Sequence, residues 1–379
     1  MPAPSDTLSG RALNRALLDR QLLLRRDPLP TAAAPRAGRV IETVEHLVGL
    51  QAQAPFPPYY GLWSRLGGFR PGDLSELLLT RKVVRIGLMR GTIHLVSADD
   101  CLGLRPVMQE ALERGLRGNF GRQLTGVDRA ELARAGRALV EDRPMTFSEL
   151  GAALSPRWPG HPRNALAQGV RALVPLVQVP PRGVWGESGQ AAHTSAESWL
   201  GRPLGSSASP EPVMLRYLAA FGPATVADAQ AWSGLTGLRE VVARLEPQLR
   251  TFRDAQGREL FDLPGAPRPD PDTPAPVRLV AEFDNLVLSH GDRSRVISEP
   301  DRQRLYTKNG IFPGTVLIDG FVAGMWRLTR ARGATVLTIE MFGPSGGPDR
   351  DAVAAEGERL LEFAAPGSPD AELRFGPIT

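Results

Sequence analysis

Cysteine and lysine are almost absent from this chain. Its 379 residues include one cysteine, Cys101, and the only lysines are Lys82 and Lys308. A single thiol cannot close an intrachain disulfide, and it cannot supply a cysteine-based zinc or iron–sulfur site. The sequence therefore argues against a disulfide scaffold and against a cysteine-ligated metal protein.

Long apolar runs are also missing. No stretch of about 18 uninterrupted apolar residues occurs, so we expect no helix that spans a membrane. Residues 1–15 lack an apolar core followed by a small-residue cleavage site, which argues against a secretory signal. We expect a soluble, cytoplasmic protein. Its length is more than one ordinary domain needs, so two to four compact units are expected.

Arginine supplies nearly all of the positive charge, and the formal net charge is +4. Guanidinium groups suit phosphate oxygens and guanine edges because they donate two parallel hydrogen bonds. A GC-rich genome would also favour arginine codons. The total number of arginines therefore carries little weight, and only their clustering favours DNA binding.

The clearest pattern lies in the middle of the chain, where helices lead to a short pair of strands. Thr146 and Glu149 are spaced as in a capping box, which opens a helix. Residues 162–173 have the pattern of an amphipathic helix. Two strands are predicted at 176–179 and 183–185, on either side of a proline-rich turn. Helix, helix and hairpin follow one another in the order of a winged helix.

The same order recurs elsewhere in the chain. After the middle unit, helical patterns precede predicted strands at 249–253 and 259–263, and a first unit is expected before it. Beyond residue 276, alternating segments predict strands and a final helix. The sequence therefore predicts an α+β fold with three tandem winged-helix (helix-turn-helix) units and a β-rich C-terminal module. The expected boundaries are 10–125, 126–205 and 206–270 for the three units, and 276–379 for the module.

Several arginines occupy positions that favour DNA binding. Two lie on the predicted middle helix, one in its wing, and two at the tip of a predicted C-terminal hairpin, where they would meet phosphates or a groove. Protein–protein modules can share the same helix and hairpin order, and charged turns are often merely exposed. The candidate DNA-binding residues are Arg163, Arg171, Arg182, Arg330 and Arg332.

Two glutamines follow a predicted helix near the N-terminus. Gln51 continues the apolar face of that helix, and the helix is predicted to end near Gln51 because Pro55 disfavours helical geometry at Ala54. In an extended segment, Gln51 and Gln53 would point to the same side. Two amides can orient a water and stabilise developing positive charge, although they are weak bases. By itself, Gln-x-Gln is more typical of a solvated helix end.

Two further groups of polar residues are candidates for an active site or a DNA-binding site. Arg90, Thr92 and His94 alternate along a predicted strand and would share one face. They would approach the substrate or phosphates, or the histidine would only hold a sheet edge. The densest polar cluster lacks the paired histidines of a metal site, so it is either a DNA-contacting loop or a salt-bridged turn. Its members are Asp284, Asn285, His290, Asp292, Arg293 and Arg295.

Taken together, these motifs resemble those of the AlkZ/YcaQ-type winged-helix DNA glycosylases. The resemblance is carried by the order and spacing of Gln51-Ala52-Gln53 and the segments 90–94 and 282–295, and Asp319-Gly320 and residues 324–326 fit the same pattern. It extends from about residue 10 to the C-terminus. The Gln–Gln form is similar to the AlkZ branch, while Ala52 is small for the middle position.

The resemblance implies a monofunctional DNA glycosylase that acts in base excision repair. Its substrates would be N7-alkylated purines in double-stranded DNA, including bulky adducts and interstrand crosslinks, with Gln51 and Gln53 as catalytic residues. Alkylation at N7 makes guanine a good leaving group, so two amides and a positioned water would suffice. The scarcity of lysine argues against a Schiff-base lyase step. No cofactor or metal is expected, and a monomer is the expected state.

Two other functions fit the same sequence. A non-enzymatic winged-helix transcription regulator would share the helices, wings and arginines, but it would not need Gln51 and Gln53 to converge. A protein-interaction scaffold would show no salt-dependent binding to DNA. Release of a base from alkylated DNA distinguishes an enzyme from both.

Overall fold

Helices and strands alternate along most of the chain, so the fold is α+β as predicted. The structure is a computed structural model, and it describes residues 7–305, 312–331, 333–343 and 346–377. None of the helices in these ranges is long and apolar enough to cross a membrane.

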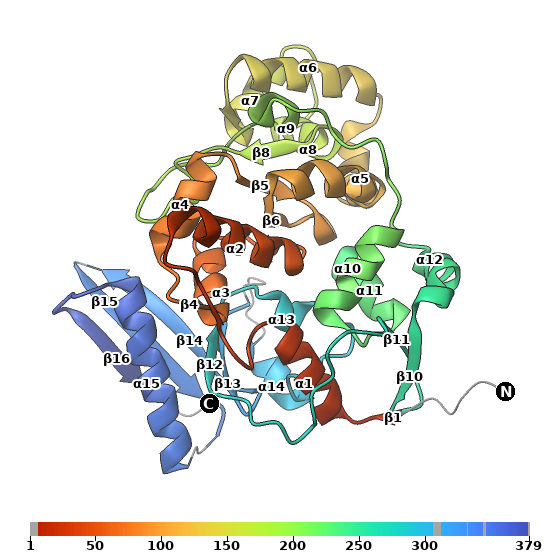
Figure 1. Ribbon diagram of the computed structural model, residues 1–379. Helices are drawn as coiled ribbons and strands as arrows, with labels where there is room; N and C mark the ends of the chain where they lie inside the picture. The colour runs from red at the N-terminus through yellow and green to blue at the C-terminus, as the bar shows by residue number, and fades with distance from the viewer. Residues whose placement is uncertain (1–6, 306–311, 332, 344–345, 378–379) are drawn as a thin grey trace.

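The N-terminal segment runs from β1 to β6; in Figure 1, α2 lies in the middle of the molecule, whereas α1 and β1 lie at its lower edge. Most of its helices are short and are joined by strands of only two residues. The elements are β1 (Thr7–Leu8), α1 (Gly10–Arg20), β2 (Asp27–Pro28), α2 (Ala33–His46), β3 (Leu50–Gln51), α3 (Pro57–Arg65), β4 (Leu66–Gly67), α4 (Pro71–Leu79), β5 (Val83–Gly87), the 3-10 turn η1 (Met89–Gly91) and β6 (Ile93–Ser97).

The middle segment, α5 to α9, forms a helical cap at the top of Figure 1. The predicted capping box is confirmed, because the backbone N–H of Thr146 donates to Glu149 and that of Glu149 donates to the Thr146 hydroxyl. The elements are α5 (Ala98–Phe120), the 3-10 turn η2 (Gly121–Leu124), α6 (Arg129–Asp142), β7 (Met145–Thr146), α7 (Phe147–Leu154), α8 (Arg163–Leu173), β8 (Leu176–Gln178), β9 (Ala192–Ser195) and α9 (Ala196–Leu200).

The strand predicted at 183–185 is wrong, and β8 pairs with β9 instead. Trp185 is drawn away from the sheet, because its ring packs against Tyr59 and Tyr60 of α3 with centroids 5.0 and 5.7 Å apart. The Tyr59 hydroxyl also donates to the carbonyl of Gly183 at 2.7 Å. Aromatic burial therefore outweighs strand formation in this loop.

One six-stranded sheet joins the N-terminal and middle segments. Its strand order is β3-β6-β5-β8-β9-β7, so the sheet crosses the unit boundary expected at residue 125. The division into separate units stays a prediction. Because the sheet is continuous, strands β3, β5 and β6 are held in register together with neighbours from the helical cap.

The third segment, α10 to β11, repeats the order of helices followed by a hairpin. The hairpin predicted at 249–253 and 259–263 is confirmed, with Thr251 opposite Phe261. The parallel pairing of β1 with β10 adds a third strand. The elements are α10 (Glu211–Phe221), α11 (Val226–Ser233), α12 (Leu238–Leu245), the 3-10 turn η3 (Glu246–Gln248), β10 (Arg250–Asp254) and β11 (Glu259–Asp262).

The C-terminal segment contains a five-stranded sheet of order β12-β13-β14-β15-β16, covered on one face by α15 (Figure 1). The β-rich character and the final helix predicted for this region are confirmed. The elements are β12 (Arg278–Val280), α13 (Asn285–Leu288), α14 (Glu299–Leu305), β13 (Gly314–Ile318), β14 (Phe321–Ala331), β15 (Ala334–Met341), α15 (Gly347–Ala364) and β16 (Ala371–Phe375).

Helix α1 connects the third and C-terminal segments. The Asn14 amide donates to the carbonyls of Arg295 and Gly320, both at 2.8 Å. Arg20 pairs with the buried Asp262 at 2.7 Å. Gly320 has φ 82°, and a Cβ atom there would lie 2.5 Å from Oδ1 of Asn14. Glycine is therefore required at this contact for both conformation and space.

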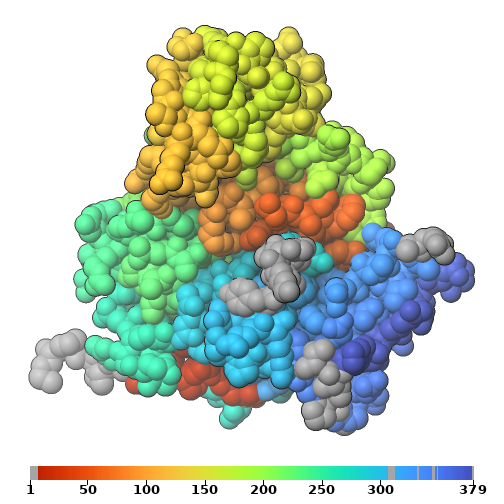
Figure 2. Space-filling view, turned by 180° about the vertical axis from the view of Figure 1, so that it is seen from behind, coloured from red at the N-terminus to blue at the C-terminus, as the bar shows by residue number. Residues whose placement is uncertain are grey.

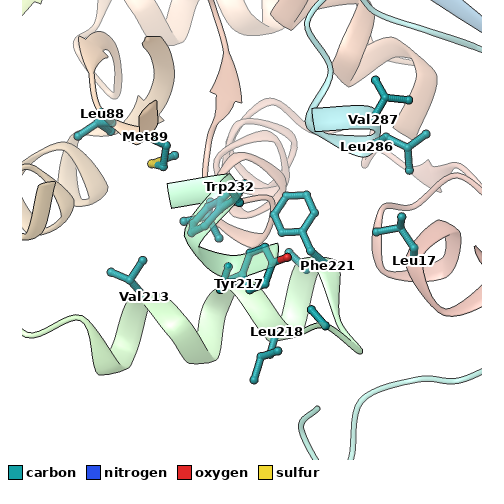
Figure 3. Packing of buried hydrophobic residues seen from close by; sticks show 14 of the residues in the cluster. Leu17, Leu88, Met89, Val213, Tyr217, Leu218, Phe221, Trp232, Leu286 and Val287 are labelled. Carbon is teal, nitrogen blue, oxygen red and sulfur yellow. The ribbon is translucent and has the colours of Figure 1, made fainter. Parts of the chain in front are cut away.

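A large apolar core lies beneath η1 and α13. Figure 3 shows the rings of Tyr217, Phe221 and Trp232 gathered at α10 and α11, with Met89 and Leu286 among the surrounding side chains. The centroids of Tyr217 and Trp232 are 4.9 Å apart. Because all five side chains are buried, η1 and α13 are fixed on the same core.

Candidate active site

Gln51 lies in a strand and not at a helix end. Helix α2 ends at His46, about five residues earlier than predicted, and the chain turns through Val48 (φ 53°) and Gly49 (φ 87°). A Cβ atom at Gly49 would lie 2.7 Å from a methyl carbon of Val96. Pairing with β6 then places Gln51 opposite His94. The helix ends earlier than predicted because the chain turns to pair with β6, a strand that is distant in the sequence.

The side-chain oxygens of both glutamines are fixed by the segment that leads into β6. Gln51 is 8% exposed, and its Oε1 accepts a hydrogen bond from Nη2 of Arg90 at 2.8 Å. Gln53 is exposed, and its Oε1 accepts from the backbone N–H of Ile93 at 3.2 Å. The backbone N–H of Ala52, between them, donates to the Ile93 carbonyl at 2.7 Å. Both amides are therefore held beside residues 90–93.

Arg90 and Thr92 do not lie on a strand, contrary to the predicted alternation. Arg90 belongs to η1 and has φ 55°, while β6 begins only at Ile93. The Thr92 hydroxyl donates to the Met89 carbonyl at 3.1 Å, which closes the turn. His94 is on the strand but fully buried. The turn separates the three side chains and directs Arg90 toward Gln51.

Arg90 bonds only to neutral oxygen atoms among the described residues. Besides Gln51, its guanidinium donates to Oδ1 of Asn285 at 3.0 Å and to the backbone carbonyl of Trp232. Burial and then the nearby Arg293 lower the pKa of Arg90 to about 10. The group is still protonated at neutral pH, so the site holds a positive charge without a carboxylate partner.

Three buried polar atoms around Arg90 have no hydrogen-bond partner among the described residues. They are Nε2 of His94, Nδ2 of Asn285 and Nε1 of Trp232. Nδ1 of His94 faces the Thr92 carbonyl at 3.1 Å, so that nitrogen carries the proton and Nε2 is an acceptor. Burial and then Arg90 lower the pKa of His94 to about 3, which keeps the ring neutral. Unpaired buried groups are uncommon, and here three residues close to Arg90 each have one.

Arg85 holds the loop that carries the two glutamines, and it was not among the predicted residues. This buried side chain on β5 donates to the carbonyls of Ala52 and Pro55 at 2.8 and 3.2 Å, and to Oε1 of Gln178 at 3.0 Å. Burial and then Arg182 lower the pKa of Arg85 to about 10. A single charge within the apolar strand 83–86 was the signal in the sequence.

The predicted polar cluster at 284–295 divides between the core and the site. Asp284 caps α13 and forms two 2.8 Å hydrogen bonds with the buried Arg65. His290 is buried, and its Nε2 donates to the carbonyl of Phe221 at 3.1 Å. These contacts favour structural roles for Asp284 and His290.

Further along the cluster, Arg295 is buried and donates to the carbonyl of Pro223 at 2.7 Å. Asp292 pairs with Arg258 at 2.6 Å in a half-exposed turn. Only Asn285 and Arg293 act on Arg90, the first by a hydrogen bond and the second by its charge. The cluster therefore contributes two residues to the site and otherwise resembles the salt-bridged turn.

The predicted DNA-binding arginines occupy different environments. Arg163 is exposed at the start of α8, and Arg182 donates to the carbonyl of Gly189 at 3.1 Å. Arg171 is half-buried beneath η1, where it donates to the carbonyl of Gly91 at 2.9 Å. Arg163, Arg171 and Arg182 stay predictions for DNA contact.

The predicted C-terminal hairpin is present as β14 and β15, and contact of Arg330 with DNA stays a prediction. Arg330 lies within β14, donates to the carbonyl of Ala364 at 2.9 Å and lies over the ring of Trp185. Its side chain is thus directed back toward α15, because aromatic and carbonyl contacts are available there. Arg332 lies outside the described residues. Within the described ranges, no group of three histidine, cysteine, aspartate or glutamate residues could hold a metal ion.

Figure 2 shows one face of the molecule, where an orange part of the N-terminal segment reaches the surface. The helical cap lies above this part, and the third and C-terminal segments lie below it. Residues from all four segments therefore surround the region from which the site is built.

Comparisons with known proteins agree with this arrangement. A family model described as "DNA glycosylase AlkZ-like" matches residues 44–363. The structure of the Streptomyces sahachiroi DNA glycosylase AlkZ is similar, with a TM-score of 0.75 over 98% of this chain and 100% of that chain, at 19% sequence identity. No match is found among the curated proteins. At this identity the structural likeness shows a common fold.

Proposed function

Because this chain belongs to the AlkZ-like DNA glycosylase family, we propose that it is a monofunctional glycosylase for N7-alkylated purines in double-stranded DNA. Bulky adducts and interstrand crosslinks belong to the proposed substrate class, and the role is base excision repair. The observation that carries the proposal is the hydrogen bond by which Arg90 fixes Oε1 of Gln51. A solvated helix end would not need such a contact.

The proposed reaction breaks the bond between C1′ of the deoxyribose and N9 of the purine. The electron pair of that bond moves to the purine, whose positive charge is thereby neutralised. The oxygen of a water then adds to C1′, a proton passes to solvent, and the products are the free alkylated base and an abasic site. A cationic base leaves readily, so the protein mainly has to orient water and stabilise the sugar cation.

Gln51 and Gln53 are assigned these two tasks. Arg90 holds Oε1 of Gln51, so the NH₂ group of this amide is left to bind the substrate or the attacking water. Gln53 is exposed on the same loop, and its carbonyl dipole is suited to face the positive charge that develops on the sugar. Arg85 is a positioning residue, because it bonds the backbone carbonyls on either side of Gln53.

We also propose that the helix and hairpin units act as winged helices on DNA. In the third segment, α11 and α12 would form the helix-turn-helix, and the hairpin β10–β11 would be the wing. In the middle segment, α7 and α8 precede the pair β8–β9 in the same order. Support comes from this repeated order and from the arginines on α8, which would contact phosphates.

Base release from a duplex that contains one N7-methylguanine tests the proposed function. We expect Gln51→Ala and Gln53→Ala each to lower the single-turnover rate by roughly 10²–10³-fold, the range found for loss of one stabilising amide. Melting temperatures should stay close to that of the wild type. Gln123→Ala, at an exposed glutamine on η2, is the matched control and should retain full activity.

Undiminished base release by both variants would contradict the assignment of Gln51 and Gln53. If the wild-type protein releases no base but binds one undamaged sequence tightly, the chain is a regulator and the proposed function is wrong. These outcomes are separable, because release and binding are measured on the same duplexes.

A further inference from the structure

A cavity of about 390 Å³ is lined in part by Arg90, whereas Gln51 is not among its lining residues. It is partly open and is lined mainly by η1, α5 and α8, and Arg90 is the residue that it shares with the candidate active site. Two further arginines line it, Arg114 from α5 and Arg171 from α8. Three arginines from three different elements therefore line the cavity.

None of the described residues that line this cavity carries a negative charge. Arg171 donates to the carbonyl of Gly91 at 2.9 Å and to Oε1 of Gln168 at 3.3 Å. Arg114 donates to the carbonyl of Gly234, and its nearest carboxylate is that of Glu110, 3.9 Å away on a side chain that is 79% exposed. An ion pair at that distance and exposure is weak.

This arrangement differs from that of two other buried arginines, each of which has a carboxylate partner. Arg20 has Asp262 at 2.7 Å and Arg65 has Asp284 at 2.8 Å. At the cavity, guanidinium groups instead meet neutral acceptors, and burial lowers the pKa of both Arg90 and Arg171. Positive charge that is partly removed from water and not neutralised attracts an anion.

We propose that this cavity binds one phosphodiester group of the DNA strand, next to the nucleotide that reacts at Gln51. The inference rests on the proposed function and adds the strand contact that would hold the lesion in register. Guanidinium groups suit this ligand, because their paired N–H groups match phosphate oxygens. The cavity is larger than a phosphate, and Leu112, Leu116 and Phe120 give it an apolar side for the attached deoxyribose.

Replacing single phosphodiester linkages by uncharged methylphosphonates tests this inference. The duplex would carry a 2′-fluoro N7-methylguanosine so that it resists base release, and binding would be followed by fluorescence anisotropy. In the wild type we expect one linkage near the lesion whose replacement weakens binding about tenfold, as for the loss of a charged hydrogen bond. Arg114→Gln should weaken binding of the unmodified duplex by a similar factor.

The decisive experiment combines the methylphosphonate linkage with the Arg114→Gln variant. At the linkage held by the cavity, the methylphosphonate should have little further effect on Arg114→Gln, and the salt slope of that variant should fall by about one. Arg117→Gln, one turn along α5 and outside the cavity, is the matched control and should keep the full effect of the methylphosphonate. Arg171→Gln provides a second variant if Arg114→Gln does not fold.

Equal methylphosphonate losses in the wild type and in both cavity variants at every linkage would overturn the inference. Equal responses of Arg114→Gln and Arg117→Gln would also overturn it, because the effect would then be one of general charge. Base release is scored separately on a duplex without the 2′-fluoro group. Linkage-specific binding without base release would contradict the proposed function and leave the phosphate contact standing.

Discussion

Asp284 and Asn285 are neighbours in the chain, yet they hold two arginines in opposite ways. The Asp284 carboxylate neutralises Arg65 through two 2.8 Å contacts, and both side chains are almost fully buried. The Asn285 amide gives Arg90 one neutral acceptor at 3.0 Å and leaves its charge unbalanced. One change of side-chain type therefore separates a structural ion pair from a charged site.

The two arrangements differ in how strongly they resist the loss of one partner and in how strongly they attract an anion. A buried ion pair strongly resists the loss of one partner, because the other charge is then left without compensation. An arginine bonded to amides and carbonyls keeps its full attraction for an incoming anion. Arg65 joins α3 to the C-terminal segment, while Arg90 lines the cavity that we propose binds the DNA strand.

The largest effect is expected for the structural pair. Asp284→Ala leaves the Arg65 guanidinium buried without its counterion, so the free energy of unfolding should fall by about 3–5 kcal/mol. Urea denaturation at neutral pH measures this change. Asp292→Ala, from the same cluster but with a 37% exposed side chain, is the control and should lose no more than about 1 kcal/mol. If both variants lose the same free energy of unfolding, the distinction between a buried and an exposed ion pair is wrong.

A smaller loss of stability is expected when the pH is lowered. The pKa of His94, about 3 in the folded protein, is below its unfolded value, so the neutral ring stabilises the fold fully above about pH 6.5. This contribution is lost as the pH falls from about 6.5 toward 3. At pH 5 the loss is roughly 2 kcal/mol, from about 1.5 pH units at 1.36 kcal/mol each.

Denaturant unfolding at pH 7 and pH 5 checks this expectation. The wild type should lose stability between the two values, and His94→Gln should lose about 2 kcal/mol less over the same interval. His193→Gln provides the comparison away from the site, because burial lowers the pKa of His193 to about 4. An unchanged pH dependence in His94→Gln would contradict the buried neutral ring.

The smallest change in stability is expected for a substitution that gives residue 285 the same side chain as its neighbour Asp284. Asn285→Asp would place a carboxylate 3.0 Å from Arg90, in the position that the amide oxygen holds now. We expect the free energy of unfolding to change by no more than about 1 kcal/mol, because Coulomb gain and desolvation largely offset each other. Affinity for alkylated duplex should nevertheless fall several-fold at low salt, because one net charge is lost.

Asn285→Ala separates the added charge from the lost hydrogen bond. It removes the same contact to Arg90 without introducing a carboxylate, so its salt slope for DNA binding should match that of the wild type. If Asn285→Asp binds DNA as well as Asn285→Ala does, the unbalanced charge at Arg90 is not used in binding.

Local signals explain the parts of the fold that could be predicted from the sequence. The capping box at Thr146 and Glu149 fixes a helix start within four residues, and the short segment between the strands predicted at 249–253 and 259–263 forms the tight turn of the hairpin in the third segment. Both depend on neighbours in the chain. The positions of these elements were therefore predictable without knowledge of the tertiary structure.

The geometry of the candidate site depends on contacts between residues far apart in the sequence, which no local pattern predicts. The end of α2 follows from pairing with β6, more than forty residues later, and Arg65 finds Asp284 at a separation of 219 residues. Arg85 was missed because a charge within an apolar strand indicates burial but not its acceptors. Gln51 and Gln53 were named from order and family resemblance, whereas Arg90 became the partner of Gln51 only through a turn at positive φ.

The N-terminal helix also bears on how the chain folds as it is made. The partners of α1, which include Asp262 and Gly320, are 242 and 306 residues further along the chain than the residues they contact. At about 5–20 residues per second, a ribosome adds the last of these partners roughly 15–60 s after α1. During that interval Leu17 and the buried arginines of α1 have no native contacts there to cover them. Docking of α1 on these partners therefore cannot be completed until the C-terminal segment has been synthesised, and until then only other segments can cover its apolar face.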